Sequence, residues 1–139
     1  MLPSGLIALV TFALLGNLAP TQAKPDFSGS WTVHSGLESW GVERLTIAQT
    51  PSSVVIRVTK GNGVKLESQT YRLDGTGSRT ESTSQSPRTH WIGDALAIDW
   101  TTELEVYAFD RQDRLVVMRV WTPMENGTMG TSRVIYQRE

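Results

Sequence analysis

The sequence predicts an all-β fold, built as a single up-and-down antiparallel barrel of about eight to ten strands. Apolar and polar residues alternate with a period of two along much of the chain, which is typical of strands with one face in a core. Short segments rich in Gly, Asn, Asp and Pro separate these stretches, and such residues form tight turns. A sheet of many short strands must close or cover its edges, and an up-and-down barrel closes with the shortest connections; a β-sandwich is the alternative.

The first element, residues 1–23, is expected to be a signal peptide. It carries no charged side chain, and its apolar run covers only residues 6–15. A run of that length is too short for a bilayer core, which needs about 20 residues. Small residues at the end of the segment suit cleavage before Lys24. We therefore expect residues 24–139 to form one barrel domain, secreted or periplasmic, with no stable membrane anchor after processing.

The charges of the chain argue against some classes of partner. There are 13 basic and 14 acidic residues, and their signs alternate along the sequence rather than clustering. No basic surface for nucleic acid is therefore expected. The chain has no cysteine, so its stability must come from barrel closure and packing rather than from disulfides. We expect a monomer.

The alternating rows predict which side chains point into the barrel. In each row the apolar residues lie two positions apart and so share one face of a strand. The predicted inward rows are Leu45 and Ile47; Val54, Ile56 and Val58; Leu96, Ile98 and Trp100; and Leu104, Val106 and Ala108. This assignment puts Glu103 and Glu105 on the outer face as solvated charges.

Two rows compete for the interior in residues 115–121. Val116, Met118 and Val120 form a uniformly apolar row, which is the predicted inward face. Arg119 lies in the opposite row with Trp121 and is then expected to face solvent. The alternative, an inward Arg119 that binds a ligand carboxylate, remains open because a one-residue slip reverses both faces.

The polar segment 75–89 predicts the weakest part of the barrel wall. It contains a run of Ser, Thr, Arg, Glu and Gln with no alternating apolar row. Without apolar side chains on one face, a strand gains little from joining a sheet.

Short motifs throughout the chain resemble those of the lipocalin-like (calycin-type) small barrels, in particular exported bacterial ones. The opening motif is Phe27-Ser-Gly29-Ser-Trp31, and further matching pieces lie at residues 45–49, 71–75, 91–96 and 134–138. The resemblance implies that Gly29 lets the first strand bend and that Trp31 fills the closed end of the barrel. It also implies that an arginine of the last strand packs over the Trp31 ring. Arg133 and Arg138 are both candidates, and the sequence does not choose between them.

Catalytic and metal-binding patterns are missing from the sequence. The two histidines, His34 and His90, have no ligand spacing with other residues. No nucleophile elbow or paired catalytic carboxylates are evident, so we expect neither an enzyme nor a bound metal or cofactor.

The remaining candidates for function are the apolar residues predicted to line the barrel mouth. Trp40 lies in the segment expected to cover the mouth. The predicted ligand-binding residues are Trp40, Leu96, Ile98, Trp100, Val116, Met118 and Val120. Because sites in such barrels lie in the mouth and are mostly apolar, we expect a small apolar ligand there. The alternative is a barrel filled by its own side chains that acts as a non-enzymatic interaction or inhibitor module.

Overall fold

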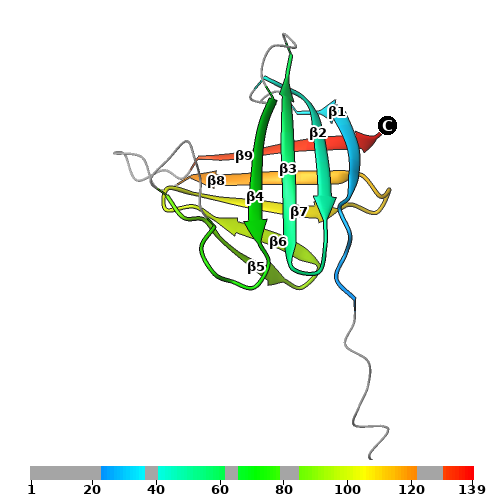
Figure 1. Ribbon diagram of the computed structural model, residues 1–139. Helices are drawn as coiled ribbons and strands as arrows, with labels where there is room; N and C mark the ends of the chain where they lie inside the picture. The colour runs from blue at the N-terminus through cyan, green and yellow to red at the C-terminus, as the bar shows by residue number, and fades with distance from the viewer. Residues whose placement is uncertain (1–22, 37–40, 62–65, 79–84, 122–129) are drawn as a thin grey trace, which may run out of the picture.

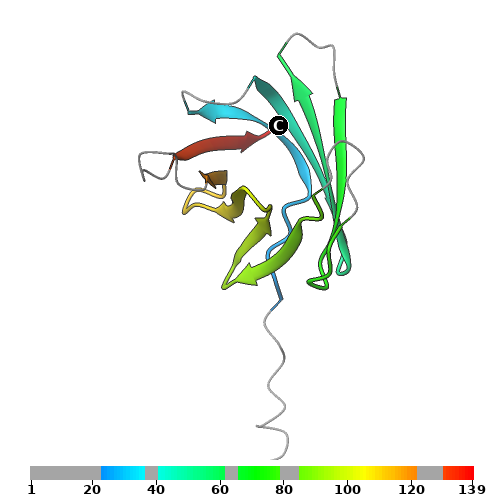
Figure 2. The same ribbon diagram turned by 90° about the vertical axis from the view of Figure 1, so that its left-hand side faces the viewer.

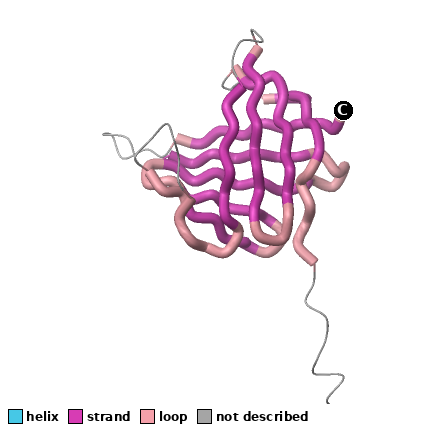
Figure 3. Tube along the Cα trace, viewed as in Figure 1, coloured by secondary structure: helices cyan, strands magenta, loops and turns pink. Residues whose placement is uncertain are grey.

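The computed structural model describes residues 23–36, 41–61, 66–78, 85–121 and 130–139. Within these ranges nine strands form one antiparallel sheet and no helix is present (Figures 1 and 3). Among the same residues no helix is long and apolar enough to cross a membrane. The strands are β1 (Gly29–Ser35), β2 (Val42–Gln49), β3 (Ser53–Lys60), β4 (Leu66–Arg72), β5 (Arg88–Ile92), β6 (Ala95–Asp99), β7 (Glu103–Phe109), β8 (Leu115–Trp121) and β9 (Thr131–Arg138).

Consecutive strands pair as neighbours, and the last strand returns to the first. The order across the sheet is β4-β3-β2-β1-β9-β8-β7-β6-β5, so β1 hydrogen-bonds both β2 and β9. In Figure 1, β2, β3 and β4 run across the direction of β6 to β9. Figure 2 shows that these two groups of strands face each other as opposite walls around a common interior. The fold is therefore the predicted all-β antiparallel barrel, nearly closed.

The barrel wall is interrupted between β4 and β5, the two ends of the sheet. No ladder joins these strands in the described residues. They are held by fewer bonds: the Thr89 hydroxyl donates to the carbonyl of Arg72, and the Ser78 amide donates to the carbonyl of Pro87 at 2.9 Å. The weak wall predicted from the polar segment 75–89 is confirmed. In the described part of this segment, the hydroxyls of Ser78 and Thr89 satisfy the backbone of Arg72: its N–H donates to Ser78 Oγ, and its carbonyl accepts from Thr89.

Large aromatic side chains fill one end of the barrel, which we call the closed end. Trp31 is completely buried and donates its indole N–H to the carbonyl of Phe27 at 3.0 Å. The guanidinium of Arg138 lies 4.3 Å from the centre of the Trp31 ring, a cation–π contact. Gly29 has a φ of +145°, and a Cβ there would lie 2.5 Å from Arg138 Nη1. Arg138 therefore occupies the place over Trp31, whereas Arg133 is exposed on the outer face in register with Met118.

The inward rows predicted on β2, β3 and β6 are confirmed. Leu96 and Ile98 are at most 1% exposed, and both belong to the central apolar core. Trp100 continues the same row just after β6 and packs against that core while remaining partly exposed.

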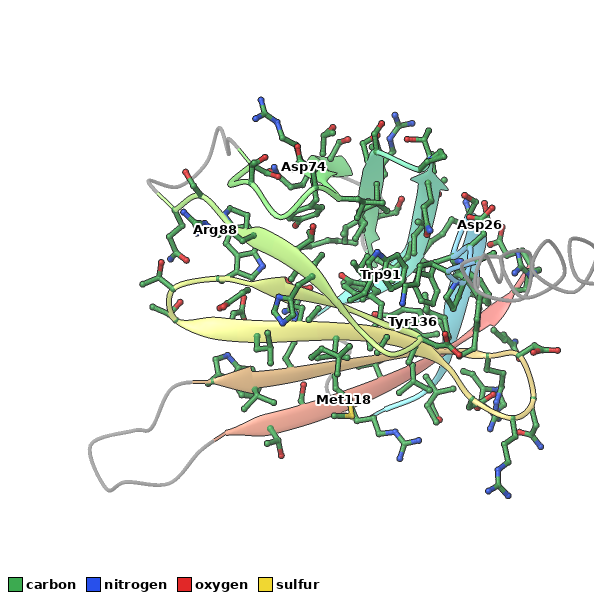
Figure 4. The ribbon with its side chains drawn as sticks, turned by 90° about the horizontal axis from the view of Figure 1, so that it is seen from below. Asp26, Asp74, Arg88, Trp91, Met118 and Tyr136 are labelled. Carbon is green, nitrogen blue, oxygen red and sulfur yellow. The ribbon has the colours of Figure 1, made fainter. Side chains whose placement is uncertain are left out.

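The inward rows predicted on β7 and β8 are wrong. Glu105 on β7 is only 5% exposed, and it is in register with the inward Ile98. Met118 on β8 is 42% exposed and points away from the barrel, whereas Tyr136 of β9 points into it (Figure 4). The β7–β8 and β8–β9 registers determine the facing of the other residues on these strands, because paired residues share a face. The outward residues are Leu104, Val106 and Ala108 on β7 and Val116, Met118 and Val120 on β8.

The prediction chose the wrong face of β7 and β8 because their outer row is more uniformly apolar than their inner row. The inner row of β8 contains Arg119, and that of β7 contains Glu105 opposite it. These two charged groups lie together inside the barrel and compensate each other, so the interior tolerates them. When the inner row contains a compensated charged pair, a prediction from hydropathy alone assigns the wrong face to the interior.

Candidate functional site

Burial of the inward side chains decreases along the strands from the closed end to the opposite end of the barrel. We call that opposite end the mouth; it is formed by the ends of β6 and β8 and the beginnings of β7 and β9. On β8, Leu115 and Val117 are at most 2% exposed, while the side chain of Arg119 is 26% exposed. On β9 the inward Tyr136 and Val134 are buried, and Ser132 as a residue is partly exposed although its hydroxyl is buried. Solvent therefore reaches inward-facing side chains at the mouth.

Glu105 is the centre of a polar cluster inside the barrel. Its Oε1 accepts a hydrogen bond from the indole N–H of Trp100, and its Oε2 accepts one from the hydroxyl of Tyr107, both at 2.8 Å. Arg119 Nη2 lies 3.7 Å from Oε2 of the same carboxylate. Two strands, β7 and β8, and the β6–β7 turn thus contribute to one cluster, which explains how a nearly buried carboxylate is stabilised. The Ser132 hydroxyl, in register with Arg119, is buried without a hydrogen-bond partner among the described residues.

Burial also shifts the pKa values of the groups around this cluster. It raises the pKa of the Glu103 carboxyl, an effect that Arg119 opposes and Glu105 reinforces. The pKa values of Tyr71 and Tyr107 are raised well above the ordinary value, first by burial and then by the negative charge of Glu105. Burial raises the pKa of Tyr136 to about 12. All three phenols are therefore neutral at physiological pH.

Aromatic rings line the same region of the interior. The rings of Tyr71 and Trp100 meet edge to face with their centres 6.0 Å apart. Glu103 and Trp121 are in register on β7 and β8 at the mouth, and the backbone N–H of Trp100 donates to the backbone carbonyl of Glu103 across the β6–β7 turn. The mouth therefore combines aromatic surface with a few charged groups, the composition expected of a small-molecule site.

A separate pocket of about 380 Å³ lies at the closed end. Lys24, Asp26, Leu73 and Trp91 are among its lining residues, and Figure 4 shows Asp26 and Trp91 at this end. Lys24 lies 5.7 Å from the centre of the Trp91 ring and donates to the carbonyl of Gly93 at 3.0 Å. Ala23 also lines this pocket, so the predicted cleavage before Lys24 would remove part of its wall.

The structure brings together only some of the predicted site residues. Leu96, Ile98 and Trp100 line the interior, with Trp100 toward the mouth. Val116, Met118 and Val120 lie on the outer face and cannot line an interior site. The prediction for Trp40 lies outside the described residues.

Sequence reasoning missed the inward Glu105 and Tyr107, and it kept an inward Arg119 only as the alternative to a solvent-facing one. One signal could have found the inward face. Tyr107 and Phe109 share a row with Glu105, and two large aromatic residues in one row favour the core face over solvent. An inward Glu105 then requires an inward Arg119, because the tight β7–β8 turn places them opposite each other.

The described residues contain no group of three or more His, Asp or Glu side chains that could hold a metal ion. Both histidines are exposed, and His34 Nδ1 lies 3.1 Å from the side-chain oxygen of Gln137.

A solved structure is similar to this fold over most of its length. It is the crystal structure of zebrafish ileal bile acid-binding protein complexed with cholic acid, which matches with a TM-score of 0.66 and 13% sequence identity. The match covers 81% of this chain and 98% of the zebrafish chain. No protein-family model and no curated protein sequence matches the chain. At this identity the likeness shows the fold alone, a calycin-type β-barrel.

Proposed function

We propose that this protein binds a small, largely apolar ligand in the mouth of its barrel. The observation that carries the proposal is the decrease in burial of inward side chains toward the mouth. Apolar side chains that face the interior and still contact water gain free energy when a ligand covers them, by about 25 cal/mol for each Å² of apolar surface. The cholic acid complex of the zebrafish protein supports the proposal, because a barrel of the same fold accompanies a small amphipathic molecule.

The contact residues follow from the register of the strands. Trp100 provides partly exposed apolar surface next to the polar cluster, and the buried Ile98 lies below it in the same row. Tyr71 packs its ring edge on Trp100 from the facing wall. A ligand in this place would put its apolar body against the Trp100 ring, behind which the buried Ile98 and Tyr71 pack, and its polar group near Arg119 or Glu103.

Tryptophan fluorescence tests the proposal. Fatty acids, retinoids and haem are titrated against the purified protein and against two variants, Trp100→Phe and Trp91→Phe. We expect a saturable change at micromolar ligand, largely lost in Trp100→Phe and retained in Trp91→Phe, because Trp91 lies at the closed end. If no compound changes either the fluorescence or the melting temperature, ligand binding in the mouth is rejected.

The outer face of β7 and β8 favours a second candidate function, an interaction or inhibitor module. Apolar side chains occupy this face, and Met118 at its centre is 42% exposed. Exposed apolar surface of this kind occurs at sites of protein association. Replacing Met118 with Glu would impair a function of this face and leave ligand binding in the mouth unchanged.

Export is also part of the proposal, with processing before Lys24. The uncharged segment 1–23 with its short apolar run supports it. The intact mass of the exported protein should lack residues 1–23, and a full-length membrane-bound product would contradict the proposal.

A further inference from the structure

The polar groups at the mouth limit the chemistry of any ligand that binds there. Glu105 and Arg119 face each other across β7 and β8, so their opposite charges largely compensate. A ligand carboxylate could reach Arg119 only in competition with Glu105, and it would be repelled by that carboxylate and by Glu103. The polar cluster therefore disfavours an anionic group.

Glu103 is the charged group of this wall that no hydrogen bond satisfies. Its row on β7 is the inward row of Glu105 and Tyr107, one step closer to the mouth. Among the described residues no donor contacts its carboxylate, and the charged groups that act on it are Arg119 and Glu105. Burial raises the pKa of this carboxyl, which means that its charged form is disfavoured. A ligand cation beside Glu103 would therefore stabilise the carboxylate without displacing a hydrogen-bond donor.

Aromatic surface flanks the same carboxylate. Trp121 is its register partner on β8, and Trp100 lies across the β6–β7 turn. A carboxylate with a tryptophan opposite it in the register and another across the turn suits an ammonium group, because the negative ring faces and the carboxylate attract the same charge.

Resting on the proposed function, we propose that the ligand is a lipophilic amine, whose ammonium group pairs with Glu103 between Trp100 and Trp121 while its apolar part extends into the barrel. The charge of the head group is thus the property that selects the ligand.

Three probes with one apolar chain and different head groups test this assignment: decylammonium, decanol and decanoate, each titrated by calorimetry at neutral pH. We expect decylammonium to bind about tenfold more tightly than decanol, and decanoate to bind most weakly. In Glu103→Gln the advantage of the amine should disappear while decanol binding is unchanged. The matched control is Glu43→Gln, which removes an exposed glutamate of β2 and should leave all three affinities unchanged.

The outcomes separate this inference from the proposed function. If decanol binds and decanoate binds as tightly as the amine or more tightly, the assignment to amines is overturned and binding in the mouth stands. An amine preference that persists in Glu103→Gln also overturns it. If none of the three probes binds, the proposed function fails, and this inference fails with it.

Discussion

Replacing Tyr107 with Phe isolates one hydrogen bond of the polar cluster. The variant keeps the ring and removes only the hydroxyl that donates to Glu105 Oε2 at 2.8 Å. Both residues are 5% exposed, so water cannot easily replace the lost donor. A hydrogen bond to a charged acceptor contributes about 1.5–3 kcal/mol, and we expect the free energy of unfolding to fall by that amount.

Urea unfolding of four proteins measures the effect: the parent, Tyr107→Phe, Glu105→Gln and the double variant. With a neutral acceptor the hydroxyl should contribute only about 0.5–1.5 kcal/mol, which leaves a coupling of about 1 kcal/mol between the two positions. Tyr136→Phe is the matched control, because the structure gives the Tyr136 hydroxyl no hydrogen-bond partner in the described residues. It should cost less than about 0.5 kcal/mol. If Tyr107→Phe costs no more than the control, or if no coupling is found, then Glu105 does not face the interior as a charged acceptor.

Three further measurements test the fold and its electrostatics. Trp31→Ala should lower the free energy of unfolding by about 3–5 kcal/mol, because a fully buried indole leaves a cavity at the closed end; a loss below about 1 kcal/mol in denaturant unfolding would contradict this. Since Tyr71, Tyr107 and Tyr136 all have raised pKa values, their folded-state contribution to stability is present below the ordinary phenol pKa of about 10 and is lost as the pH rises above it. Phenolate absorbance should therefore appear together with loss of the strand signal in circular dichroism, and phenolate formation in the folded protein near pH 10 would refute the burial of these groups. The raised pKa of Glu103 makes its charge unfavourable above the ordinary glutamate range, so Glu103→Gln should stabilise the protein at neutral pH. That gain should vanish in acid, where both states of the parent are protonated, and a gain independent of pH would point to packing instead.

The sequence by itself determined the fold class, most strand positions and the inward face of β6. Those features depend on local chemistry. Turn residues end each strand. On β6 and just after it, one face carries Leu96, Ile98 and Trp100, and the opposite face carries Asp99, which cannot be buried without a partner. The weak wall at residues 75–89 was equally local, because a segment without apolar residues gains little from joining a sheet.

Only the tertiary structure decided which face of β7 and β8 points inward. Alternation determines that two faces differ, but it does not determine which one is buried when both rows contain apolar residues. An inward Glu105 becomes favourable only when Arg119, Tyr107 and Trp100 surround it, and two of those partners come from other parts of the chain. The choice of Arg138 over Arg133 has the same origin. The β1–β9 register pairs Arg138 with Trp31, and such a long-range pairing leaves no local mark in the sequence.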